Sequence, residues 1–136
     1  MVKIQIVYEG DLHCRLTHGP SGKEIVTDAP KDNMGKGESF SPTDLVASAL
    51  GSCMLTIMGI FAQKHGINIQ GAQVAVTKEM VKEPERKIGR ITLIFKMVRG
   101  LSSEQRSLLE KAAYTCPVHK SLSREVETPI TFEYPD

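Results

Sequence analysis

The segment from Leu45 to Gln63 contains no charged residue, and this feature restricts the possible folds more than any other. The preceding Ser41-Pro-Thr-Asp44 has the pattern of a helix start, with an N-cap serine, proline at the first helical position and a carboxylate at the third. The following Lys64-His65-Gly66 has the pattern of a helix end. Because apolar residues occur around the whole circumference, we predict a helix over residues 41–64 that is buried on nearly all sides.

A membrane-spanning helix is the rival interpretation of this segment. Small and hydroxylated residues weaken it, and the flanks lack the pattern that anchors a span at the membrane surface; these residues are Ser48, Gly51, Ser52, Thr56 and Gly59. We therefore interpret the segment as a core helix within a single domain over residues 1–136. Because a chain of this length has little other material to cover every side of such a helix, we expect a symmetric homodimer.

Alternating apolar and polar residues on both sides of the helix predict β-strands. In the first segment, Ile4, Ile6 and Tyr8 fall on one face of a strand. A second helix is predicted to begin at residue 102 or 103, and Cys116-Pro117 ends it and starts a short turn or helix. Because the strands come in runs, we predict an α+β fold with antiparallel sheets packed around a long buried central helix. The predicted strands cover residues 2–8, 12–17, 23–28, 72–80, 91–98 and 126–134.

Charge and composition exclude several functions. The 17 Lys and Arg residues nearly balance the 16 Asp and Glu residues, and a net charge of +1 gives no field that would attract nucleic acid or an anionic membrane. With no Trp and 5% aromatic residues, a surface for stacking bases is not expected. The N-terminal segment has no signal-peptide pattern, so we expect a cytoplasmic protein whose three cysteines are free thiols.

The surroundings of the three cysteines predict different behaviour. Cys53 lies on the apolar helix, where a free cysteine commonly packs as a small apolar residue, and a reactive thiol there would need a cation or donor from elsewhere in the fold. Cys116 precedes Pro117 at a predicted helix start, where backbone N–H groups point at the sulfur and favour the thiolate. Cys14 is interpreted as a strand residue.

A metal site is the second chemical interpretation of these residues. Cys116 and His119 have the spacing of metal ligands, and His13-Cys14 could add others. A second spaced pair is missing, so we expect neither a metal nor another cofactor. On local sequence alone, inert packing of the thiols and thiol chemistry both remain open.

Two segments together resemble the OsmC/Ohr family, which comprises osmotically inducible protein C and the organic hydroperoxide resistance proteins. The segment from Ser41 to Cys53 resembles the helix that carries the family's first cysteine, and Cys116-Pro-Val-His-Lys-Ser-Leu122 resembles the motif of its second cysteine. The order of the motifs and of the predicted strands and helices also agrees. The loop through Lys36-Gly37 and the carboxylate of Asp44 are closest to the OsmC-like branch.

The resemblance implies an intertwined homodimer that reduces organic hydroperoxides. Cys53 would be the peroxidatic residue and become a sulfenic acid, and Cys116 would resolve it to a disulfide. A dithiol reductant, which in Ohr relatives is a lipoylated protein, would restore both thiols. This order reverses the local prediction that Cys116 is the activated thiol, and the two agree if Cys116 is the better leaving group when the disulfide is reduced.

The sequence departs from the Ohr pattern where the first cysteine is activated. Ohr proteins use an Arg–Glu pair whose Glu stands ten residues before the cysteine, a position that Thr43 occupies here. Asp44 lies on the opposite side of an ideal helix from Cys53, so its default role is a helix cap. We keep Arg15, the only arginine in the N-terminal strands, and Asp44 as supporting candidates. The alternative function is a dimer that binds a small apolar ligand or senses redox state without peroxidase turnover.

Overall fold

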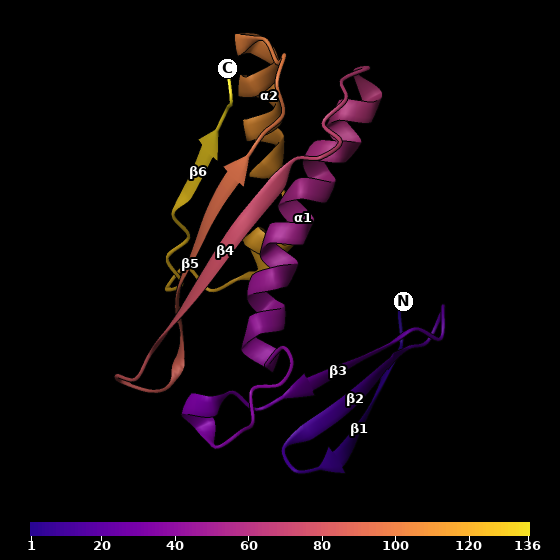
Figure 1. Cartoon of the computed structure of the whole chain (residues 1–136), viewed down its shortest axis with the longest axis vertical. Coiled ribbons are helices and arrows are strands. Elements are labelled where there is room, and N and C mark those ends of the chain that lie inside the picture. The colour runs from indigo at the N-terminus through magenta and orange to yellow at the C-terminus, as the bar shows by residue number, and fades with distance from the viewer. The chain divides into compact units, whose positions relative to one another are not determined.

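The computed structural model describes all residues from 1 to 136, and they divide into two units, residues 1–46 and 47–136 (Figure 1). Each unit contains one three-stranded sheet, and the helices complete an α+β fold, as predicted. The single domain over residues 1–136 stays a prediction.

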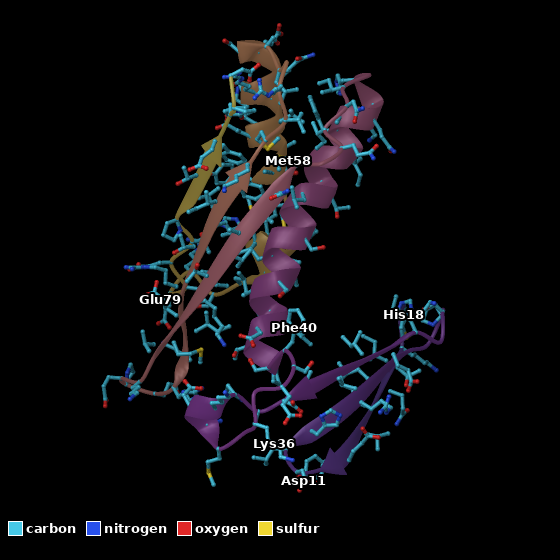
Figure 2. All side chains as sticks on the ribbon, viewed as in Figure 1. Asp11, His18, Lys36, Phe40, Met58 and Glu79 are labelled. Atoms are coloured by element: carbon cyan, nitrogen blue, oxygen red, sulfur yellow. The ribbon has the colours of Figure 1, made fainter.

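The N-terminal unit contains an antiparallel sheet in the order β1-β2-β3. Its turn between the first two strands uses backbone of positive φ, with a φ of 87° at Gly10, a conformation that glycine adopts without steric cost. Figure 2 shows Asp11 and His18 at opposite ends of this sheet. The elements of the unit are β1 (Ile4–Gly10), β2 (His13–His18), β3 (Glu24–Asp28) and the 3-10 turn η1 (Lys31–Asn33).

The two faces of this sheet differ in chemistry. Ile4, Ile6 and Tyr8 lie on one face, as the alternation predicted, and they are 58%, 57% and 63% exposed in the chain. Ile25 of β3 shares this face and is 53% exposed. The opposite face carries charged residues joined in ion pairs. The N-terminal unit by itself therefore leaves one apolar face of its sheet uncovered, and such faces mark interaction surfaces in soluble proteins.

The second sheet has the order β4-β5-β6 and mixes both kinds of strand pairing. Strands β4 and β5 are antiparallel, but β5 and β6 are parallel, so the prediction of purely antiparallel sheets is wrong. The chain between β5 and β6 forms two helices, and such a crossover returns the chain in its original direction, whereas a tight hairpin reverses it. The elements are β4 (Gln73–Val81), β5 (Lys87–Lys96), α2 (Ser103–Ala113), α3 (Pro117–Ser121) and β6 (Ile130–Glu133).

The long helix α1 (Pro42–Lys64) has the predicted bounds and the predicted cap. The Asp44 N–H donates to the Ser41 hydroxyl at 3.1 Å, and the Ser41 N–H donates to the Asp44 carboxylate at 2.9 Å. These two bonds satisfy N–H groups that a helix start leaves without partners.

Burial of α1 is confined to one side in the single chain. Its buried residues recur at helical spacing and pack with β5 and α2 in one core; they are Ala47, Leu50, Gly51, Met54, Met58 and Ala62, of which Met58 is labelled in Figure 2. On the side away from this stripe, Ile60 is 45% exposed. One sheet and one helix cover only part of the circumference, so burial of the remaining sides, which we expect from a second copy of the chain, stays a prediction. The length and composition of α1 would also allow it to cross a membrane, but here its stripe packs as in a core helix.

Candidate active site

Helix α1 holds Cys53 beside its buried stripe. Leu50 and Ile57, three residues before and four after, lie on the same side of the helix. The Cys53 side chain is half-buried and packs against the core that contains Cys116. The thiol is thus carried by a rigid element and is still partly accessible from the surface.

The position of Cys116 follows from the packing of α2. Leu109, Ala113 and Cys116 stand four and three residues apart, and all three are fully buried, so the thiol continues the core-facing side of α2 beyond its last turn. Pro117 then starts α3, with Cys116 at the N-cap. The His119 N–H donates to the Cys116 sulfur at 3.4 Å, as the local pattern predicted.

The two thiols meet in this core, where the side chain of Cys53 hydrogen-bonds with that of Cys116. Burial raises the pKa of the Cys116 thiol, and its contact with Cys53 raises this pKa further. The N–H groups of His119 and Val118 lower the pKa of Cys116 without offsetting these effects. The prediction that Cys116 is the activated thiol is therefore wrong, because desolvation outweighs the backbone donors. The idea that Cys116 is the better leaving group loses its basis for the same reason.

Thiols in direct contact have a defined chemistry. Such a pair can be oxidised to a disulfide and reduced back to two thiols. The bond requires the two Cα atoms to lie within about 7 Å of each other. All three cysteines are free thiols in the structure. Cys53 and Cys116 therefore form the dithiol state of a candidate redox centre.

Arg15 and Asp44 have structural partners of their own. In the N-terminal unit, Arg15 Nε donates to Glu9 at 3.1 Å and Arg15 Nη1 lies 3.9 Å from Glu24, and the contact with Glu9 raises the pKa of Arg15. Asp44 caps α1, which is its predicted default role. Thr43 occupies the position where Ohr proteins have glutamate. The Thr43 hydroxyl lies 3.2 Å from the Ser41 hydroxyl. The structure thus gives Arg15 an ion-pair role and Asp44 a capping role.

Cys14 occupies the strand position that the sequence predicted. It lies in β2, opposite Tyr8 on β1 and Thr27 on β3. Nowhere in residues 1–136 do three His, Cys, Asp or Glu side chains come together in an arrangement that could hold a metal ion.

His119 has contacts that the sequence reasoning missed. Its ring Nε2 lies 3.1 Å from the Thr128 hydroxyl, and its ring stands edge-on to Tyr114 with the centroids 6.2 Å apart. The sequence marked His119 only as a possible metal ligand together with Cys116. Nothing in the sequence pointed to Thr128, because that contact depends on where the chain returns to the sheet.

An apolar groove of about 420 Å³ runs between α1 and α2, and its lining includes sequence neighbours of both thiols but neither thiol itself. Ile57 in its lining is one helical turn beyond Cys53, and Thr115 directly precedes Cys116. The lining residues are Ile57, Ile60, Phe61, Lys64, Leu108, Lys111, Ala112 and Thr115. The groove could therefore receive an apolar molecule between the two helices that lead to the thiols.

Comparison with known proteins relates this arrangement to one family. A family model described as OsmC-like protein matches residues 35–131. No functionally curated protein matches the sequence. The solved structure of a Psychrobacter arcticus 273-4 protein, connected provisionally with the osmotic stress and detoxification response, has 40% sequence identity and a TM-score of 0.92. The similarity covers 98% of this chain and 96% of that one.

Two solved organic hydroperoxide resistance proteins have the same fold at lower identity. The OsmC protein of Legionella pneumophila has 15% identity and a TM-score of 0.76, over 98% of this chain and 96% of that one. OhrB of Bacillus subtilis has 19% identity and a TM-score of 0.69, over 98% of both chains. At such identities the likeness establishes the fold.

Proposed function

Because the chain belongs to the OsmC-like family, we propose that it is a thiol-dependent peroxidase that reduces organic hydroperoxides in defence against oxidative stress. The observation that carries the proposal is the contact between the Cys53 and Cys116 thiols. These residues are far apart in the sequence and belong to different helices, so only the tertiary fold brings their thiols into contact. The family includes organic hydroperoxide resistance proteins, which supports the same chemistry.

In the proposed reaction Cys53 is the peroxidatic residue. Its thiolate attacks the distal oxygen of the hydroperoxide, the O–O bond breaks, and the alcohol leaves with a proton. Cys53 is then a sulfenic acid and the peroxide has gained two electrons. Partial exposure suits Cys53 to this step, whereas the fully buried Cys116 cannot meet a peroxide first.

Cys116 is the resolving residue in this proposal. Its thiolate attacks the Cys53 sulfur, the S–O bond breaks, and hydroxide leaves as water with a proton from solvent. The product is the Cys53–Cys116 disulfide. A dithiol reductant, such as a lipoylated protein, then exchanges with this disulfide and restores both thiols while its own pair becomes a disulfide.

The groove between α1 and α2 supports an organic rather than an inorganic peroxide. Apolar side chains such as Ile57, Phe61 and Leu108 dominate its lining, and burying apolar substrate surface there is favourable. No cofactor takes part, since the thiols supply both electrons. The three free thiols are consistent with a reducing cytoplasm, where we place the protein.

We further propose that the protein is a homodimer. Ile4, Ile6 and Tyr8 form an apolar face that the N-terminal unit leaves open, and in the C-terminal unit the side of α1 that carries Ile60 is also exposed. A second copy can cover the same surfaces on both protomers, because a two-fold interface is self-complementary.

Thiol counting after a single oxidation tests the proposed function. We start from a Cys14→Ser protein, fully reduced under anaerobic conditions, and add one equivalent of cumene hydroperoxide. Two thiols should disappear per chain, Cys53→Ser should prevent this, and Cys116→Ser should leave Cys53 as a sulfenic acid that dimedone labels. Cys14→Ser alone is the matched control and should behave as the native protein. Unchanged thiol content after oxidant addition would rule the proposed function out.

The alternative is a dimer that senses redox state or binds a small apolar ligand without turnover. Thr43 favours it, because a threonine cannot supply the carboxylate that activates the cysteine in Ohr proteins. Steady-state consumption of hydroperoxide with dithiothreitol, dihydrolipoamide or a thioredoxin system separates the two functions. Repeated turnover supports the peroxidase, and consumption that stops after one equivalent supports the sensor.

A further inference from the structure

We propose that His119 is a positioning residue that holds Cys116 against Cys53 for disulfide formation, an inference that rests on the proposed function. Two parts of His119 make contacts in different directions. Its backbone N–H donates to the Cys116 sulfur at 3.4 Å, and its ring Nε2 lies within hydrogen-bond distance, 3.1 Å, of the Thr128 hydroxyl. One residue thus links the resolving thiol to the segment that leads into β6.

The partner of the His119 ring is fixed to the sheet. Thr128 stands between Glu127 and Pro129, whose carbonyl oxygens accept the N–H groups of Ile91 and Leu93 on β5 at 2.8 and 2.9 Å. Backbone hydrogen bonds on both sides of Thr128 therefore hold its hydroxyl in place. The ring of His119 is consequently tied to β5 through one intermediate residue.

Helix α3 needs such an anchor because it has only five residues. An isolated helix of this length is not stable in water, so external contacts must hold its first turn in register with the Cys116 sulfur. On another side the ring stands edge-on to Tyr114, with the centroids 6.2 Å apart. Tyr114 and Thr128 together fix the ring, and the ring fixes the backbone that carries the N–H donor.

The position of Cys116 matters most after Cys53 has been oxidised. A disulfide forms only within narrow limits of Cα separation and dihedral angle, so small movements of the Cys116 backbone slow the attack on the sulfenic acid. His119 acts through its backbone and the Thr128 contact. It is therefore a positioning residue, and its conservative replacement should keep the role. The side-chain amide of glutamine reaches about as far as Nε2, so His119→Gln retains the link to Thr128, and His119→Ala removes it.

Alkylation of Cys116 tests the positioning without any peroxide. In a protein with Cys14→Ser and Cys53→Ser, Cys116 is the only thiol, and its burial should make it slow to react with iodoacetamide. Alkylation is measured on the alkaline plateau of its rate, where Cys116 is ionised in every variant and its pKa no longer affects the rate. There we expect His119→Ala and Thr128→Val to speed alkylation about tenfold, which corresponds to about 1.4 kcal/mol, the size of one net hydrogen bond. His119→Gln and the exposed control Lys120→Ala should react at the rate of the parent protein. Equal rates in all variants, or a His119→Gln protein as reactive as His119→Ala, would overturn the proposal.

Single-turnover oxidation tests the same residue in the reaction. In the Cys14→Ser background, Cys53 should be oxidised by cumene hydroperoxide at one rate in all variants. Disulfide formation should be about tenfold slower in His119→Ala and Thr128→Val than in His119→Gln and Lys120→Ala. Its pH midpoint should also rise in the two slow variants, because a looser N–H donor stabilises the Cys116 thiolate less. If Cys53 is not oxidised in the parent protein, the proposed function fails, and the alkylation rates still decide the role of His119.

Discussion

Two glycines of helix α1 are expected to respond in opposite ways to the same substitution. A Cβ atom added at Gly51 would lie 2.8 Å from Val76 Cγ2 and 3.2 Å from Val74 Cγ1, whereas a Cβ atom at Gly59 would meet no atom within 4 Å. Both glycines are inside the helix, where alanine is intrinsically better by about 1 kcal/mol. The two sites therefore share the gain in helix propensity and differ only in packing.

The packing cost at Gly51 outweighs that gain. Val74 and Val76 belong to β4, and branching at Cβ restricts rotation of their side chains, so neither methyl group can move aside easily. Overpacking of a core costs about 1–3 kcal/mol. We expect Gly51→Ala to lower the free energy of unfolding by about 1 kcal/mol after the propensity gain. Gly59→Ala should raise it by about 1 kcal/mol.

Equilibrium urea denaturation of both variants at one protein concentration measures this difference. The free energies of unfolding should differ by about 2 kcal/mol, which separates the midpoints by about 1 M urea at a slope of about 2 kcal/mol/M. Gly51→Ala should also slow formation of the Cys53–Cys116 disulfide, because it displaces α1 two residues before Cys53. If Gly51→Ala is as stabilising as Gly59→Ala, the close contact of α1 with β4 is not as described and the reasoning fails.

Two further predictions concern the N-terminal unit. Ile6→Lys should shift the sedimenting species from dimer to monomer by placing a charge on the apolar face, whereas Gln5→Lys on the opposite face should not; a native protein that sediments as a monomer would contradict the dimer. Asp28 accepts a hydrogen bond from the His13 ring at 2.5 Å and another from the Glu38 N–H at 3.1 Å, and these contacts, the first above all, hold the pKa of Asp28 below its usual value. Its carboxylate therefore adds stability above its unfolded pKa of about 4, and this is lost as the pH falls through the lower folded pKa. Urea denaturation between pH 7 and pH 2 should show a smaller loss of stability with acid for Asp28→Asn than for the native protein, and equal losses would contradict this role.

The elements around the thiols could be predicted because their signals are local. Ser41 and Asp44 set the start of α1 through bonds between neighbours in the sequence, so the cap could be identified without knowledge of the fold. The same holds for Cys116, since Pro117 after it fixes a helix start and brings the His119 N–H to the sulfur. The candidate pair itself came from the resemblance of two such local motifs.

Other features depended on segments that are far apart in the sequence. The parallel pairing of β6 with β5 follows from the path of the chain through α2 and α3, which alternation of residues does not encode. The contact of His119 with Thr128 depends on the same return to the sheet. The apolar residues of α1 indicated burial but not which side of the helix packs against β5 and α2.

The amino-acid sequence alone determined where α1 begins and ends and that Cys116 caps a short helix, because hydrogen bonds between near neighbours decide both. Only the tertiary structure decided that Cys53 and Cys116 touch and that the pKa of Cys116 rises. The local N–H donors favour the thiolate, but the core formed by Leu109, Ala113 and their neighbours removes water from the sulfur. Desolvation depends on everything packed around an atom, and no stretch of neighbouring residues specifies that.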